Sequence, residues 1–108
     1  MLNKDDFFKI DIRVGTIVDA SVNKKTRVPA YKLKIDFGEL GIKNSSAQIT
    51  DLYTPDTLIG RQVICVFNLT PVKISEVKSE VLVLGTITDK GVVLLNVDEK
   101  VENGLRIS

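Results

Sequence analysis

Two groups of polar side chains in this sequence have the residue types of a site for an anionic ligand. The first is a stretch with no acidic residue and five basic ones: Lys24, Lys25, Arg27, Lys32 and Lys34. The second is the segment 68–80, which separates two apolar runs and carries Lys73 and Lys78. Because the net charge of the whole chain is only +1, a local basic patch suits a restricted anionic ligand better than broad coating of a nucleic-acid duplex. On charge alone, a solvated lysine-rich loop with no ligand is as good an explanation of these residues as a binding patch.

The residue types argue against catalysis. The chain has no histidine, which removes the commonest proton shuttle and metal ligand. Its single cysteine, Cys65, lies inside an apolar run, where we expect a buried structural thiol in a reducing cytoplasm. No glycine-rich phosphate loop and no paired metal-binding carboxylates are found. We therefore expect a binding protein that is not an enzyme and that needs no metal or cofactor.

Length and composition predict one globular domain spanning residues 1–108. The chain is 44% hydrophobic and 27% charged, which is ordinary for a globular protein. No apolar run approaches the roughly 20 residues of a membrane span. The first residues are acidic where a signal peptide has a basic start and an apolar middle. We expect a cytoplasmic location from these features.

The elements that position the polar groups are predicted strands. Residues 63–67 and 81–84 are short Val-rich apolar runs typical of buried strands. Apolar and polar residues alternate over 10–14, 31–37 and 44–49, which predicts half-buried strands. Gly15 interrupts the first alternation, so a bulge or a sharp bend is expected there. Residues 19–30 are polar and basic, and they are predicted to form a loop.

The order of these segments predicts an all-β, five-stranded OB-fold barrel. Residues 54–60 have the signature of a short helix between the third and fourth strands. A short N-terminal helix within 2–9 and a C-terminal strand extension complete the expected fold. Phe7 and Phe8 need a cover, which either the barrel end or a second subunit could supply.

OB-folds bind ligands on the outer face of the second and third strands, between the loops that join strands one to two and four to five. On this face we expect the following ligand-binding residues: Arg27, Lys32, Lys34, Ser46, Gln48, Asn68, Lys73, Lys78, Ser79 and Glu80. Asn68 is at least as well explained as a side chain that fixes a turn. Glu80 could pair with a loop lysine or accept a hydrogen bond from the ligand. Few aromatic residues are free to stack on bases, which leaves folded RNA and polypeptide as candidate ligands.

Several segments, in matching order and spacing, resemble the tRNA-binding OB domain family over nearly the whole chain. The family segments are DIRVG (11–15), KLKIDFG (32–38), NLTPVKI (68–74) and the pair Ser79-Glu80. A more particular resemblance is to the CsaA branch of export-related bacterial chaperones, through RVPA (27–30), SSAQIT (45–50) and KSEVLVLG (78–85). General tRNA-binding members have glycine and methionine where this chain has Val81 and Leu82, which favours the chaperone branch.

The resemblance implies a cytoplasmic homodimer with one binding pocket on each subunit. It places the leader 1–9, with Phe7 and Phe8, and the extension 89–108 in the dimer interface. Two hypotheses follow. In the first, the dimer binds unfolded preproteins in protein export, with delivery to the secretion motor ATPase as an open extension. In the second, it is a structure-specific tRNA-binding protein that contacts phosphates through Arg27, Lys32, Lys34 and Lys73.

Overall fold

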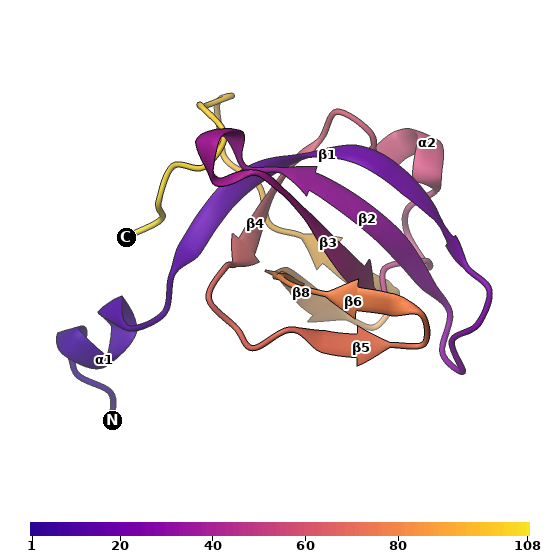
Figure 1. Cartoon of the computed structure of the whole chain (residues 1–108), viewed down its shortest axis with the longest axis horizontal. Helices are drawn as coiled ribbons and strands as arrows, with labels where there is room; N and C mark the ends of the chain where they lie inside the picture. Colours follow the sequence, from indigo (N-terminus) through magenta and orange to yellow (C-terminus); the bar gives the residue numbers. More distant parts are fainter.

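A computed structural model describes every residue of the chain, 1–108. Its first elements are α1 (Lys4–Phe8), β1 (Ile12–Asn23), β2 (Ala30–Asp36), the 3-10 helix η1 (Gly38–Leu40), β3 (Ile42–Ala47) and α2 (Pro55–Leu58). The remaining strands are β4 (Gln62–Val66), β5 (Val72–Ile74), β6 (Val77–Ser79), β7 (Leu82–Val83), β8 (Gly85–Thr88) and β9 (Gly91–Leu94). An antiparallel sheet in the order β3-β2-β1-β4-β7 curls into a half-barrel, and the hairpins β5–β6 and β8–β9 lie outside it (Figure 1). The predicted OB-like barrel, with α2 between β3 and β4, is confirmed.

The alternation in β2 sorts its side chains as predicted. Leu33 and Ile35 are fully or almost fully buried in the core, while Lys32 and Lys34 are exposed on the outer face. Gly15 in β1 faces the same core, where a Cβ atom would lie only 2.7 Å from Cγ2 of Ile35. The glycine therefore permits a close approach of β1 to β2. The register shift between β1 and β2 falls between Ile17 and Asp19, so of the two expectations for Gly15, a bulge or a sharp bend, the bulge lies a few residues away.

The prediction of a loop over 19–30 is also wrong for half of its length. β1 continues to Asn23, and its last residues pair with the start of β2 from Ala30 onward. Only residues 24–29 connect the two strands, and we call them loop 24–29. The end of this ribbon extends past the barrel core, so both faces of β1 at Ser21 and Val22 are exposed. Without one buried face, the sequence there loses the alternation that marks a strand.

The two apolar runs at 63–67 and 81–84 form the neighbouring strands β4 and β7, with Cys65 opposite Val83. The sheet edge at β3 is joined to the segment before β7 by one backbone and one side-chain hydrogen bond: Glu80 N–H donates to the Asn44 carbonyl, and the hydroxyl of Ser45 donates to the Val81 carbonyl, both over 2.8 Å. The predicted third strand, 44–49, is shifted by two residues, since β3 spans Ile42–Ala47. The segment between β4 and β7, predicted as a loop, contains the β5–β6 hairpin.

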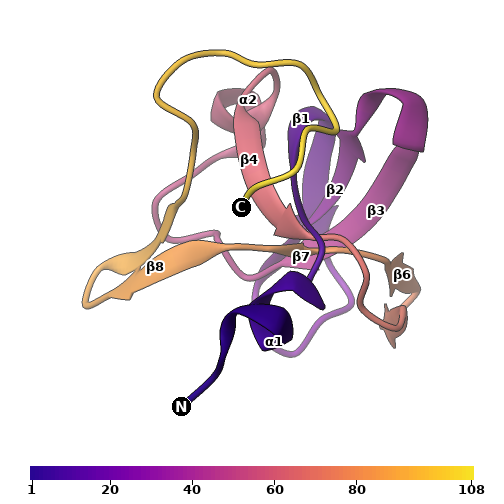
Figure 2. The ribbon, with the colours of Figure 1, turned by 90° about the vertical axis from the view of Figure 1, so that its left-hand side faces the viewer.

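The C-terminal segment returns to the barrel. The backbone of Val14 accepts a hydrogen bond from Gly104 N–H and donates one to the Leu105 carbonyl, and Arg106 forms a single bridge with Arg13. The predicted final strand is thus reduced to one bridge. Figure 2 shows this segment passing over β4 and β1 while the β8–β9 hairpin projects sideways from the barrel. None of the helices has the length and apolar character needed to cross a membrane.

Candidate functional site

The base of the β5–β6 hairpin is fixed to the edge of β3. The N–H of Ser46 donates to Oγ of Ser79 over 3.2 Å. The backbone of Asn44 bonds to Glu80 twice, because its carbonyl accepts from Glu80 N–H at 2.8 Å and its N–H donates to Oε1 of Glu80 at 3.1 Å. The carboxylate of Glu80 therefore holds the sheet edge and does not pair with a loop lysine. These bonds place the hairpin across the outer face of β2 and β3.

The tip of the hairpin contacts loop 24–29. Nζ of Lys25 lies 2.6 Å from Oε1 of Glu76, and the hydroxyl of Ser75 donates to the Lys25 carbonyl over 2.8 Å. The two loops expected to flank the binding face thus meet, although 50 residues separate Ser75 from Lys25. Asn23 anchors the other side of the loop, since its Oδ1 accepts from Lys25 N–H and its carbonyl from the Thr26 hydroxyl.

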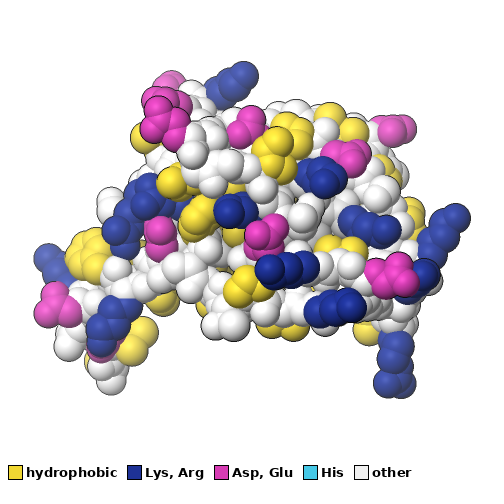
Figure 3. Space-filling view, viewed as in Figure 1, with side chains coloured by type: hydrophobic (Ala, Val, Ile, Leu, Met, Phe, Trp, Pro, Cys, Tyr) yellow, Lys and Arg dark blue, Asp and Glu magenta, His cyan; other side chains and the backbone are white.

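A cleft of about 490 Å³ lies between this hairpin and the outer face of the β1–β2–β3 sheet, and we call it the basic cleft. Its lining residues are Asp19, Ser21, Lys32, Leu33, Lys34, Asn44, Glu76, Val77 and Lys78. Figure 3 shows lysine and arginine side chains over β2 and the hairpin, with acidic side chains among them. Three of the predicted cations share this cleft. The two carboxylates, of Asp19 and Glu76, were not predicted, and they make the cleft mixed in charge.

Two smaller concavities adjoin the hairpin. The small cleft, of about 270 Å³, brings Arg27, Ser46 and Gln48 together beside Ser75 and Ile74. The apolar groove, of about 190 Å³, lies on the side of the hairpin toward β7. Its lining residues are Ser46, Leu69, Thr70, Val72, Ile74, Ser79, Glu80, Val81 and Leu82. Sequence reasoning missed this groove, although the aliphatic residues at 69, 72 and 74 were a signal that could have indicated it.

Two predicted site residues lie outside these concavities. Lys73 stands opposite Lys78 on the hairpin, and like charges in that arrangement repel. Asn68 serves the N-terminal helix: its Oδ1 accepts from Asp11 N–H and its Nδ2 donates to the Lys9 carbonyl, both over 2.8 Å. The side chain of Asn68 therefore fixes a backbone segment, as one of its two interpretations expected, but the segment is the leader and not its own turn.

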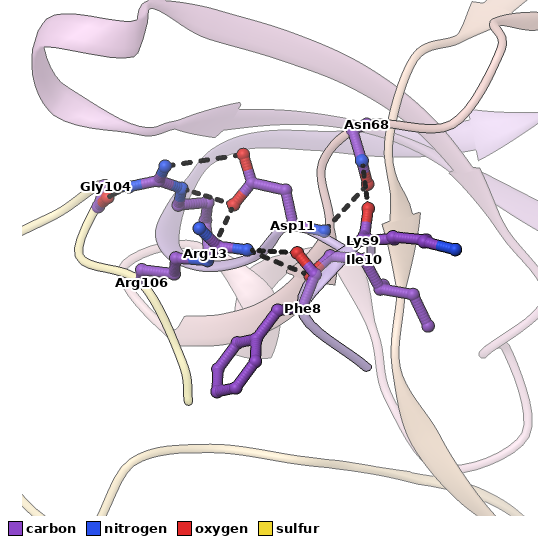
Figure 4. Close-up of polar contacts among 8 residues, drawn as sticks. All are labelled: Phe8, Lys9, Ile10, Asp11, Arg13, Asn68, Gly104 and Arg106. Atoms are coloured by element: carbon purple, nitrogen blue, oxygen red, sulfur yellow. Dashed lines mark hydrogen bonds and ion pairs between the residues drawn. The ribbon is translucent and has the colours of Figure 1, made fainter. Parts of the chain in front are cut away.

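The junction after α1 is held from a second side by the C-terminal segment (Figure 4). Nη2 of Arg106 donates to the carbonyls of Phe8 at 2.9 Å and Ile10 at 3.4 Å. Nε of Arg13 bonds to Oδ1 of Asp11 at 2.7 Å, and the guanidinium of Arg106 lies 3.7 Å from the same oxygen. We call Asn68, Asp11, Arg13 and Arg106 the helix clamp. It holds α1 away from the barrel.

The helix clamp leaves the apolar side chains of α1 uncovered. Phe7 is 38% exposed and Phe8 51% exposed, and their rings contact each other edge to face. Asn3 and Asp6 cap the helix through reciprocal side-chain bonds, which explains how so short a helix forms. The barrel end therefore leaves both phenylalanine rings partly exposed.

Cys65 is fully buried in β4, and desolvation raises the pKa of its thiol to about 12. The neutral thiol is therefore the form present at physiological pH. This agrees with the structural role expected from its apolar surroundings.

Comparisons with known proteins relate both the sequence and the fold to described families. Residues 12–106 match the family model described as "Putative tRNA binding domain". Methionine–tRNA ligase of Methanococcoides burtonii is 37% identical over 103 residues, which cover 95% of this chain and 15% of that protein. The chain thus spans about 15% of the length of the methionine–tRNA ligases that it matches.

Solved structures match the whole chain. The CsaA chaperone protein from Picrophilus torridus is 52% identical with a TM-score of 0.95 and full coverage of both chains. The chaperone CsaA from Bacillus anthracis str. Ames is 50% identical with a TM-score of 0.95, covering 100% of this chain and 99% of that one. A MetRS related protein from Pyrococcus horikoshii is 33% identical with a TM-score of 0.89, covering 100% and 98%. The similarity includes α1 and the C-terminal segment as well as the barrel.

Proposed function

Because this chain belongs to the tRNA-binding domain family, we propose that it is a non-catalytic binding module, and that its ligand is an unfolded preprotein. The resemblance inferred from the sequence segments is confirmed by the family match and by CsaA chaperones that are 50% and 52% identical to this chain. The observation that carries the choice of ligand is the apolar groove. It lies beside a cleft of mixed charge, an arrangement suited to an extended chain with aliphatic and charged side chains.

The groove supplies the contacts that a polypeptide needs. Leu69, Val72 and Leu82 are each about half exposed, at 47%, 57% and 49%, so they present apolar surface that a ligand can cover. Burial of that surface stabilises a complex without requiring a particular charge on the ligand. The lysines of the basic cleft then contact acidic side chains or the carboxyl terminus of the same chain.

Structure-specific tRNA binding is the second candidate, and the three lysines of the basic cleft favour it. Lys32, Lys34 and Lys78 form a cluster of cations of the kind that contacts phosphates. The carboxylates of Asp19 and Glu76 in the same cleft repel phosphates, which weakens this candidate relative to the first.

We further propose a cytoplasmic homodimer in which the exposed Phe7 and Phe8 are covered by the partner subunit. The helix clamp presents α1 at the end of the molecule opposite loop 24–29 and the hairpin tip (Figure 1). Contact through α1 would leave one set of clefts free on each subunit. Delivery of the bound preprotein to the secretion motor ATPase is the extension of this proposal in the cell.

A salt titration distinguishes the two ligands. Three phosphate contacts should weaken RNA binding roughly 20- to 40-fold between about 50 and 200 mM salt, whereas apolar binding should change little. The probes are a tRNA and a reduced, carboxymethylated protein that cannot fold. We expect binding of the unfolded protein with a shallow salt dependence. Failure to bind it, or to suppress its aggregation at any stoichiometry, would contradict the chaperone proposal.

Two matched double variants assign the contacts. Lys32→Glu with Lys34→Glu should fold normally because both side chains are exposed, and it should abolish tRNA binding. Val72→Ser with Leu82→Ser should also fold, and should weaken binding of the unfolded protein by about tenfold. The opposite pattern, with only the lysine variant affecting the unfolded protein, would place the polypeptide in the basic cleft alone.

A further inference from the structure

We propose that the contacts between loop 24–29 and the β5–β6 turn form a reversible latch, and that an extended polypeptide enters its full site only when the latch opens. This inference rests on the proposed polypeptide function. The latch consists of the Lys25–Glu76 ion pair and the hydrogen bond from the Ser75 hydroxyl to the Lys25 carbonyl.

The closed latch divides the binding face in two. Glu76 and Lys78 line the basic cleft, whereas Ile74 and Ser75 of the same hairpin line the small cleft. The two clefts are adjacent in the sheet, because Lys32, which lines the first, is the register partner of Ser46, which lines the second. Lifting the hairpin tip would therefore join them into one continuous groove across β2 and β3.

The contacts that hold the latch are weak enough to be reversible. Side chains of Lys25 and Glu76 are 64% and 69% exposed, and solvent-exposed ion pairs contribute little to stability. The hairpin strands bury few of their own side chains, since all of β5 is exposed. Two-stranded hairpins are marginally stable in water unless they dock on other structure. Once the tip contacts are lost, the remaining hydrogen bonds between the hairpin and β3 are those of the base, at Ser79 and Glu80.

Two features of the segments that meet at the latch are unfavourable. Ser75 has a backbone φ of +55°, a left-handed conformation that is rare for residues other than glycine. Asn23, on which loop 24–29 folds back, is only 4% exposed, and its Nδ2 has no hydrogen-bond partner. A buried donor without a partner destabilises the state that contains it. Both features lower the stability of the segments that form the latch, which favours a ligand-responsive element.

The charges around the latch favour a polypeptide as the ligand that opens it. Opening releases Glu76 and Lys25 from each other, which leaves a free carboxylate and a free ammonium at the groove, with Asp19 in the same cleft as Glu76. The carboxylates of Glu76 and Asp19 repel the phosphates of an RNA, whereas a polypeptide carries groups of both signs and can pair with the freed carboxylate and with the freed ammonium.

Covalent closure of the latch tests the proposal. In a Lys25→Cys, Glu76→Cys variant, a short bis-maleimide would join the tip to the loop, while the fully buried Cys65 would not react. The control is the same variant capped with N-ethylmaleimide. We expect the cross-linked protein to bind a fluorescent carboxymethylated unfolded protein about tenfold or more weakly than the capped protein. Reaction at Cys65 is checked by mass spectrometry.

Single substitutions give the opposite effect without a cross-link. Glu76→Gln should raise the association rate of the unfolded protein about two- to fivefold, the range expected for loss of one exposed ion pair. Glu39→Gln, which removes the same charge from the exposed 3-10 helix far from the hairpin in sequence, should leave the rate unchanged. Amides of β5 and β6 should also exchange hydrogen faster in Glu76→Gln, without any ligand.

The outcomes distinguish failure of the latch proposal from failure of the proposed polypeptide-binding function. Equal binding by the cross-linked and capped proteins would overturn the latch alone. Absence of binding by the unmodified protein would overturn the proposed polypeptide function and, with it, this role for the latch. Exclusion of an RNA oligonucleotide by the cross-link, with polypeptide binding unchanged, would show an RNA gate and would also contradict the proposal.

Discussion

At the scale of single residues, the side chains of this barrel are placed by strand alternation and by close contacts in the core. Lys32 and Lys34 are exposed for the same reason that Leu33 and Ile35 are buried: successive side chains of a strand point to opposite faces. Cys65 obeys the same rule and points inward from β4. Its burial has a consequence that can be measured at alkaline pH.

The free energy of unfolding should fall above about pH 9 because of Cys65. Burial raises the pKa of its thiol from 9.0 to about 12, so the unfolded state releases this proton first as the pH rises. The stabilisation is complete below about pH 9 and is lost as the pH rises toward 12, which amounts to about 2 kcal/mol by pH 10.5. Urea unfolding at several pH values measures it, with Cys65→Ala as the comparison. Parallel curves for the two proteins would contradict this expectation.

At the scale of secondary-structure elements, the helix clamp is the feature that could not be predicted from the sequence. Asn68 lies at the end of β4, 57 residues from Asp11, whose N–H it accepts. A single sequence contains no sign of such a pairing, because any exposed asparagine after a strand is equally well explained by its own turn. The clamp therefore has to be tested by substitution.

Substitution of Asn68 should loosen α1 more than it destabilises the barrel. Asn68→Ala removes two hydrogen bonds to backbone groups near the surface, which should lower the free energy of unfolding by about 1 kcal/mol. Amides around residues 7–11 should exchange faster while those of β4 remain protected. Asn96→Ala, at an exposed position in the C-terminal segment, serves as the control. Unchanged exchange in the leader would mean that Arg106 alone holds it.

The strands show where sequence reasoning succeeds and where it fails. Residues 31–37 were predicted correctly because one face of β2 is buried and the other exposed, which leaves a clear period of two. Residues 19–23 were predicted as a loop because both faces of that ribbon are largely exposed, so no period remains. The β5–β6 hairpin was missed for the same reason. The shared position of Lys32, Lys34 and Lys78 followed from the fold, whereas Arg27 lines a different cleft and Lys73 lines none. Asp19 and Glu76 were missed because only basic residues were considered as site candidates.

At the scale of the whole molecule, the exposed aromatic residues of α1 predict the behaviour of the proposed dimer. Phe7→Ala with Phe8→Ala should raise the dimer dissociation constant by roughly tenfold or more, since a buried phenylalanine side chain contributes about 1.5–3 kcal/mol. The folded monomer should be unaffected because neither ring is buried. Sedimentation velocity over a concentration series measures the shift.

Ile42→Ala is a matched control for that experiment, since Ile42 is 57% exposed on β3, in a different part of the fold. We expect this variant to sediment as the unmodified protein does. Loss of the dimer in Ile42→Ala, with no change in the phenylalanine variant, would contradict this proposal and indicate that the dimer interface lies at the sheet edge formed by β3.

The two ends of the chain leave the barrel on the same side, where Arg106 holds the carbonyls that follow α1 (Figure 1). An affinity tag or a fused domain attached at either terminus would therefore stand clear of loop 24–29 and the β5–β6 turn. The same attachment would crowd Phe7 and Phe8. A larger polypeptide could thus carry this module with its clefts open to solvent, while obstructing the dimer that is proposed to form through α1.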